Sequence, residues 1–86
     1  MKKRLFFLSL IWTTTVFSQF TQIPDSNFEL ALIDLGHDDV MDGQVLTSNI
    51  NEITTLFVIQ KGISDLTGIE DFTSLMLLNC AHNNLD

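Results

Sequence analysis

The chain has 86 residues and carries 4 Lys and Arg against 11 Asp and Glu, for a formal net charge of −7. This length allows one domain at most. Three of the four basic residues lie in a leading segment that we expect to be removed, which leaves Lys61 against all 11 acids, or −10. This acidic excess excludes nucleic acid as a partner, because phosphate binding requires Lys and Arg, and it disfavours anionic membrane surfaces.

Residue patterns typical of catalysis are missing from the chain. His37 and His82 lie far apart in the sequence, and neither belongs to a metal-binding H-E-x-x-H motif. There is also no G-x-S-x-G motif. The lone Cys80 cannot form an internal disulfide, and its place in the repeat described below favours a buried, inert side chain over a reactive thiol. We therefore expect that the protein is not an enzyme.

Residues 1–18 have the pattern of a secretory signal peptide. Three basic residues at 2–4 precede an apolar run at 5–12, and Ser18 supplies a small residue before the expected cleavage point. The apolar run is shorter than the roughly 20 residues that a spanning helix needs, which favours cleavage over an uncleaved membrane anchor. We expect a secreted or cell-surface protein that begins at Gln19 and has no membrane span after cleavage.

Residues 24–36 are predicted to form a helix that covers the open end of the remaining fold. Ser26, followed three residues later by Glu29, forms a capping box, and Gly36 ends the helix. One face carries apolar side chains at helical spacing, namely Phe28, Ala31, Leu32 and Leu35. The helix would protect the first strand of the following repeats from pairing with other chains.

The segment at 37–51 has two interpretations. Counted from Asp38, it resembles a D-x-[DN]-x-D-G calcium loop, with Asp42 at the fifth position. Val40 at the third position offers no oxygen, and Asn49 at the twelfth cannot give a bidentate carboxylate. These departures favour an acidic turn with no cofactor. The alternative is a weak, partly hydrated calcium site at Asp38, Asp39, Asp42 and the Gln44 carbonyl.

Residues 53–86 contain two runs that coincide at an offset of 22 residues. The coincident pairs are Ile53 and Leu75, Leu56 and Leu78, Val58 and Cys80, Lys61 and Asn83, and Ile63 and Leu85. The second run fits the leucine-rich repeat pattern L-x-x-L-x-L-x-x-N-x-L, whose period is about 20–29 residues. We expect short half-buried strands, an Asn83 amide that pairs with backbone groups of the turn, and a tight bend at Gly68.

On these motifs, above all the runs at 61–74 and 78–85, residues 22–86 resemble the amino-terminal region of secreted bacterial leucine-rich repeat proteins with internalin-like repeats. The resemblance implies an α/β fold, a leucine-rich repeat solenoid fragment with an N-terminal helical cap. The expected parts are a signal peptide at 1–18, a helical cap with an acidic loop at 19–52, and one complete and one partial repeat at 53–86. Since a solenoid needs roughly three repeats or more, we expect a piece of a longer protein or a truncated reading frame.

The strand positions between the core residues predict a face that contacts a ligand. They include Phe57 and Ile59 in the first repeat and Leu77 and Asn79 in the second. Apolar side chains at such positions indicate a binding patch or a surface covered by other parts of the protein. The leading hypothesis is an extracellular binding module for a protein or glycan. The alternatives are a structural cap segment without a ligand of its own and a calcium-dependent surface protein.

Overall fold

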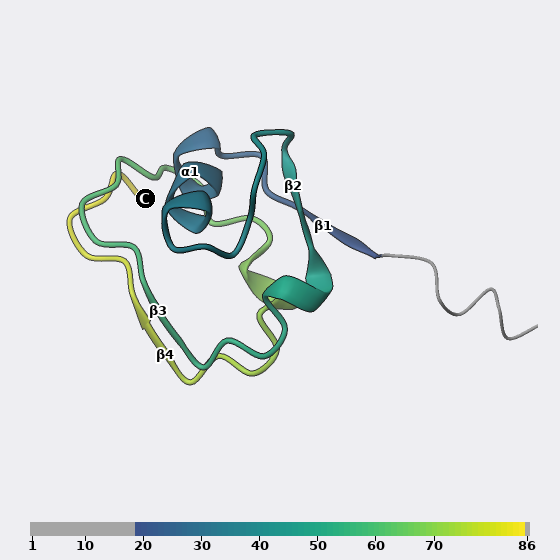
Figure 1. The fold of residues 1–86 in the computed structure, drawn as a ribbon. Coiled ribbons are helices and arrows are strands. Elements are labelled where there is room, and N and C mark those ends of the chain that lie inside the picture. The colour runs from purple at the N-terminus through teal and green to yellow at the C-terminus, as the bar shows by residue number, and fades with distance from the viewer. Residues whose placement is uncertain (1–18, 86) are drawn as a thin grey trace, which may run out of the picture.

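The computed structural model describes residues 19–85 (Figure 1). Its elements are β1 (Phe20–Gln22), α1 (Ser26–Asp34), β2 (Gln44–Leu46), β3 (Thr55–Phe57) and β4 (Leu77–Asn79), with 3₁₀ turns at Thr47–Asn49 and Ile69–Asp71. The strands β1 and β2 pair antiparallel, whereas β3 and β4 pair parallel in a separate sheet. The predicted signal peptide at 1–18 lies outside the described residues.

The N-cap of helix α1 lies one residue earlier than the sequence predicted. Asp25, and not Ser26, is the N-cap, because its backbone is extended and its Oδ1 accepts the Phe28 N–H at 3.0 Å. The other oxygen of Asp25 accepts the N–H groups of Ser64 (2.9 Å) and Asp65 (3.0 Å). One carboxylate therefore both starts the helix and attaches it to a loop almost forty residues further along the chain.

The core lies between α1 and the strands. Phe28, Ala31 and Leu32 face inward as predicted, and the ring of Phe28 stacks on that of Phe72 with 6.1 Å between centroids. The remaining buried apolar side chains are Ile23, Val45, Ile50, Leu56, Val58 and Ile63. Leu35 was predicted to share the inward face but is half-exposed. The helix ends at Asp34, Leu35 is its C-cap, and Gly36, with φ of 89°, then turns the chain.

The β3–β4 pair has the 22-residue register that the sequence predicted. Thr55 lies opposite Leu77, Leu56 opposite Leu78, and Phe57 opposite Asn79, and the two strands run side by side in Figure 1. The corners after the two strands also correspond, because Gln60 (φ 59°) and His82 (φ 60°) both adopt the left-handed conformation. The chain thus repeats its backbone path once.

Asn83 joins these two corners. Its Nδ2 donates to the carbonyls of Val58 (2.7 Å) and Cys80 (2.8 Å), and its Oδ1 accepts the N–H groups of Lys61 (2.8 Å) and Ile63 (3.1 Å). The predicted role of the amide is confirmed. At the corresponding position of the preceding corner, Lys61 contributes its backbone N–H to this network.

The prediction of a leucine-rich repeat solenoid is wrong. Residues 19–85 form a small α/β domain with one helix and two separate two-stranded sheets. The β1–β2 pair is antiparallel, so it does not extend the parallel β3–β4 pair. A solenoid requires neighbouring repeats to stack in succession, and the described part of the chain contains a single parallel pairing.

Gly68 allows the returning arm to pack closely against β1. Its φ is 107°, and a Cβ at this position would lie 2.5 Å from Ile23 Cδ1 and 2.6 Å from the Gln22 carbonyl oxygen. Only a residue without a side chain fits this approach. The predicted bend is confirmed, and the structure adds its reason.

Replacing Asn83 by alanine tests the corner network. Asn83→Ala leaves the Val58 and Cys80 carbonyls and two N–H groups without the amide, so we expect the free energy of unfolding to fall by about 2–3 kcal/mol. Urea denaturation measures this loss. The control is Asn84→Ala at the exposed neighbouring position, where a change within about 0.5 kcal/mol is expected. Equal effects of the two substitutions would contradict the role of Asn83.

Replacing Gly68 by alanine tests the close approach. Gly36 also has a positive φ, but a Cβ there would meet nothing within 4 Å. Both alanine variants strain the backbone, whereas Gly68→Ala also collides with β1. We expect Gly68→Ala to lower the free energy of unfolding by about 1–3 kcal/mol more than Gly36→Ala, as measured in urea. Similar losses in the two variants would show that packing against β1 is unimportant.

Candidate functional site

The predicted ligand-contact residues lie on the solvent side of the β3–β4 sheet. Along β3, Leu56 points into the core, whereas Thr55 and Phe57 on either side of it are exposed. Their partners across the sheet are Leu77 and Asn79. The alternation expected of a half-buried strand therefore brings side chains from two segments, 22 residues apart, to one surface.

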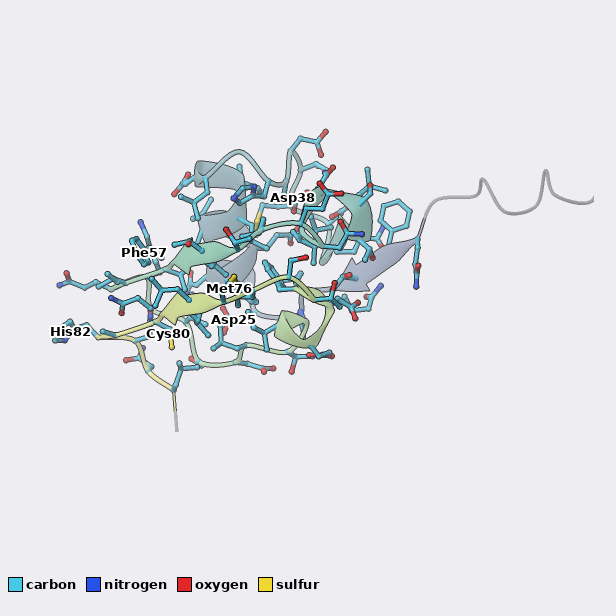
Figure 2. The ribbon with its side chains drawn as sticks, turned by 90° about the horizontal axis from the view of Figure 1, so that it is seen from below. Asp25, Asp38, Phe57, Met76, Cys80 and His82 are labelled. Carbon is cyan, nitrogen blue, oxygen red and sulfur yellow. The ribbon has the colours of Figure 1, made fainter. Side chains whose placement is uncertain are left out.

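This surface is apolar at its centre. Phe57 is 50% exposed, Leu77 54% and Ile59 37%, and we call these three residues the apolar face. Ile59 continues the outward alternation, because Val58 before it is fully buried. Met76, directly before β4, is also exposed, at 86% (Figure 2). Sequence reasoning did not single out Met76, because it lies outside the aligned strand positions.

The polar groups at this surface are few. Asn79, predicted as a contact residue, uses its Oδ1 to accept the Ala81 N–H at 3.1 Å, which engages part of its amide within the chain. Thr55 is the other polar side chain at the paired strand positions. None of Thr55, Phe57, Leu77 and Asn79 is charged, although the chain as a whole is strongly acidic. An uncharged apolar surface on an acidic domain is the result.

A second group of side chains lies where α1 meets the loop that leads to β2. Glu29, Asp38 and Asp42 bring carboxylate oxygens within 4.8 Å of one another, and we call them the acidic cluster. Two of the four residues predicted from the sequence to form a calcium site, Asp38 and Asp42, are therefore close together, whereas Asp39 is not part of the cluster. The backbone carbonyl of Gln44 was the predicted ligand; the side chain of this residue accepts a hydrogen bond from Gln22 at 3.3 Å across the β1–β2 pair.

Glu29 was predicted to complete a capping box, and that prediction is wrong. Its Oε1 accepts the Gly43 N–H at 2.8 Å and its Oε2 accepts the Asp42 N–H at 3.2 Å. The side chain is only 1% exposed. The signal that was available is the position of Glu29 directly after buried Phe28, on the part of the helix that faces the protein.

The environment of Glu29 opposes its ionisation. Burial raises the pKa of Glu29, and the neighbouring carboxyls of Asp38 and Asp42 raise it further, while the N–H groups of Gly43 and Asp42 lower it in part. The net pKa lies above the ordinary value of 4.5. A negative charge at Glu29 is therefore held by two backbone donors but disfavoured by burial and by its acidic neighbours.

Comparison with known proteins gives no match. No protein-family model matches the chain, and neither a curated protein nor a solved structure matches it significantly. The resemblance to secreted bacterial leucine-rich repeat proteins therefore stays a prediction. Within residues 19–85, no helix has the length and hydrophobicity that a membrane crossing requires.

The raised pKa of Glu29 predicts how stability depends on pH. Because the folded state binds the Glu29 proton more tightly than the unfolded state does, this residue lowers stability as pH rises from about 4.5 through the folded pKa. We expect Glu29→Gln to lose less stability than the unsubstituted protein over that range. Urea denaturation at a series of pH values, in the presence of EDTA, measures the difference.

Asp25 provides the opposite comparison in the same experiment. Burial raises the pKa of Asp25, but hydrogen bonds from the N–H groups of Ser64, Phe28, Asp65 and Asn27 outweigh it, and the net pKa is lowered. Its contribution to stability is present above about 3.8 and is lost as pH falls through the folded pKa. Parallel pH profiles for Glu29→Gln and Asp25→Asn would contradict this assignment.

Proposed function

We propose that the protein is an extracellular binding module that captures a protein ligand on the apolar face formed by Phe57, Ile59 and Leu77. The observation that carries this proposal is the exposure of Phe57 and Leu77, each about half accessible, on adjacent strands of one sheet. Contiguous exposed apolar side chains on a small soluble domain are typical of interaction surfaces. A phenylalanine at the centre of such a surface is also a typical source of binding energy.

The charge of the chain determines the kind of protein that fits. Lys61 is the single Lys or Arg after residue 18, whereas all 11 acids lie in that part of the chain. The apolar face itself carries no charge, because none of its three residues is acidic or basic. A ligand with an apolar centre and a basic rim complements both features, because opposite charges speed association and apolar contact stabilises the complex.

A protein ligand fits the face better than a glycan does. Sites for small polar ligands combine an apolar wall with several directed hydrogen-bonding groups. At the paired strand positions the polar side chains are Thr55 and Asn79, and the oxygen of Asn79 is already engaged with Ala81. The other exposed side chains are aliphatic or aromatic, as expected for contact with another protein surface.

The extracellular location in this proposal is supported by the sequence at 1–18. Its basic start, short apolar run and small residue at Ser18 are those of a cleaved signal peptide. The strongly acidic remainder of the chain is compatible with a soluble protein released from the cell or held at its surface.

Substitution of the apolar face tests the proposed function. The probe is a short peptide of alternating valine and lysine, which offers an apolar edge with basic flanks. We expect it to shift the amide NMR signals of β3 and β4. Phe57→Ser and Leu77→Ser should weaken its binding by about tenfold or more, as expected of central contact residues. The control is Leu30→Ser, which removes a half-exposed apolar side chain from α1 and leaves the charge unchanged.

Two results would contradict the proposal. One is an affinity for the peptide that is the same in Phe57→Ser, Leu77→Ser and the unsubstituted protein. The peptide would then bind through net charge alone and not through the apolar face. The other is a neutral oligosaccharide that shifts the same signals when the peptide does not, which would indicate a glycan ligand. No shift with either probe would favour a structural segment without a ligand of its own.

A further inference from the structure

One carboxylate oxygen of the acidic cluster is buried without any hydrogen-bond partner. Asp38 Oδ2 is shielded from solvent and accepts no hydrogen bond, whereas Asp38 Oδ1 accepts the Asp39 N–H at 2.9 Å. Buried polar atoms in folded proteins are nearly always paired. An oxygen of this kind, on a residue of a carboxylate cluster, therefore indicates a partner that is not part of the chain.

The three carboxylates are held in place by backbone N–H groups. Glu29 accepts from Asp42 and Gly43, Asp38 accepts from Asp39, and Asp42 Oδ1 accepts from the Gln44 N–H at 3.3 Å. Such bonds favour the ionised form of a carboxylate. They also leave lone pairs free on each group, so the cluster offers preoriented anionic oxygens from a helix and a loop.

The distances suit a calcium ion. Calcium is bound by oxygens at about 2.3–2.6 Å, so two ligand oxygens on opposite sides of the ion are about 4.6–5.2 Å apart. The three ligand atoms of Glu29, Asp38 and Asp42 lie within 4.8 Å of one another, which lets all three contact one ion. Calcium also accepts irregular geometry and takes water and carbonyl oxygens as further ligands, as this loop allows.

Within residues 19–85, no positive side chain acts on Glu29 to neutralise the cluster. The groups that act on Glu29 are two carboxyls and two backbone N–H groups, with no Lys, Arg or His among them. Lys61, the single Lys or Arg in residues 19–85, belongs to the corner of the sheet that Asn83 closes. Three carboxylates this close together, one of them buried, repel one another, and a bound cation would relieve that repulsion.

We propose that Glu29, Asp38 and Asp42 bind one Ca²⁺, which fixes the loop between α1 and β2 to the helix. This site differs from the linear loop that the sequence resembled, because Glu29 replaces Gln44 and comes from α1. The unsuitable residue at the third loop position is then no obstacle: Val40 is 53% exposed and is not needed as a ligand. The proposal is independent of the apolar face.

Calorimetric titration of the EDTA-treated protein with CaCl₂ tests the site. We expect one Ca²⁺ per chain, a rise in melting temperature of about 5 °C in millimolar calcium, and weaker binding of MgCl₂. Asp38→Asn should weaken calcium binding by about tenfold or more. Asp42→Asn should weaken it to a similar extent, and because Asp42 is the exposed member of the cluster, this substitution disturbs the packing least. The matched control is Asp39→Asn, which removes the same charge from the exposed neighbour and should leave binding within about twofold.

The proposal has clear points of failure. Equal weakening in Asp38→Asn and Asp39→Asn would mean that calcium only screens the net charge. A folded protein that takes up no calcium would also overturn it.

Discussion

Parallel pairing of β3 with β4 requires the chain to leave one strand, circle back over 22 residues and start the next strand beside it. The exit from each strand then leaves carbonyl and N–H groups that the short ladder cannot satisfy. Asn83 supplies donors and an acceptor to both exits at once, because it binds Val58, Lys61 and Ile63 after β3 and Cys80 after β4. Without this side chain, the two corners have no common partner.

Carboxylates satisfy unpaired backbone groups in the same way around α1. Asp25 accepts hydrogen bonds from N–H groups in the first turn of α1 and at Ser64. Glu29 accepts them from the N–H groups of Asp42 and Gly43. Each acid joins segments that are distant in sequence, so the fold depends on side chain to backbone bonds more than on its three-residue strands. These strands are too short to hold the chain by pairing alone.

Local periodicity could be predicted because neighbouring residues determine it. The offset between Leu56 and Leu78, the outward position of Phe57 and the need for Gly68 all follow from spacing along the chain. The roles of Asp25 and Glu29 could not be predicted in the same way. A capping box is a pattern of nearby residues, whereas Glu29 finds its partners in a loop whose position is decided by the packing of Phe28 and Val45.

The error about the solenoid has a similar origin. A repeat pattern predicts how one turn of chain pairs with the next, and the register of β3 and β4 shows that this part was correct. It does not determine what the first turn packs against. In this protein that neighbour is α1 with the antiparallel β1–β2 pair, which ends the parallel arrangement instead of continuing it. The number of stacked units is a property of the whole chain.

The paired left-handed corners at Gln60 and His82 also bear on how this protein can change. Residues with a Cβ are about 1–2 kcal/mol less stable than glycine in that conformation. The protein thus retains two bulky side chains at positions where the backbone alone would favour glycine. Substitution by glycine at either corner would therefore be expected to raise stability without any change in the buried core. A more stable relative of this protein would be expected to carry glycine at these two positions first.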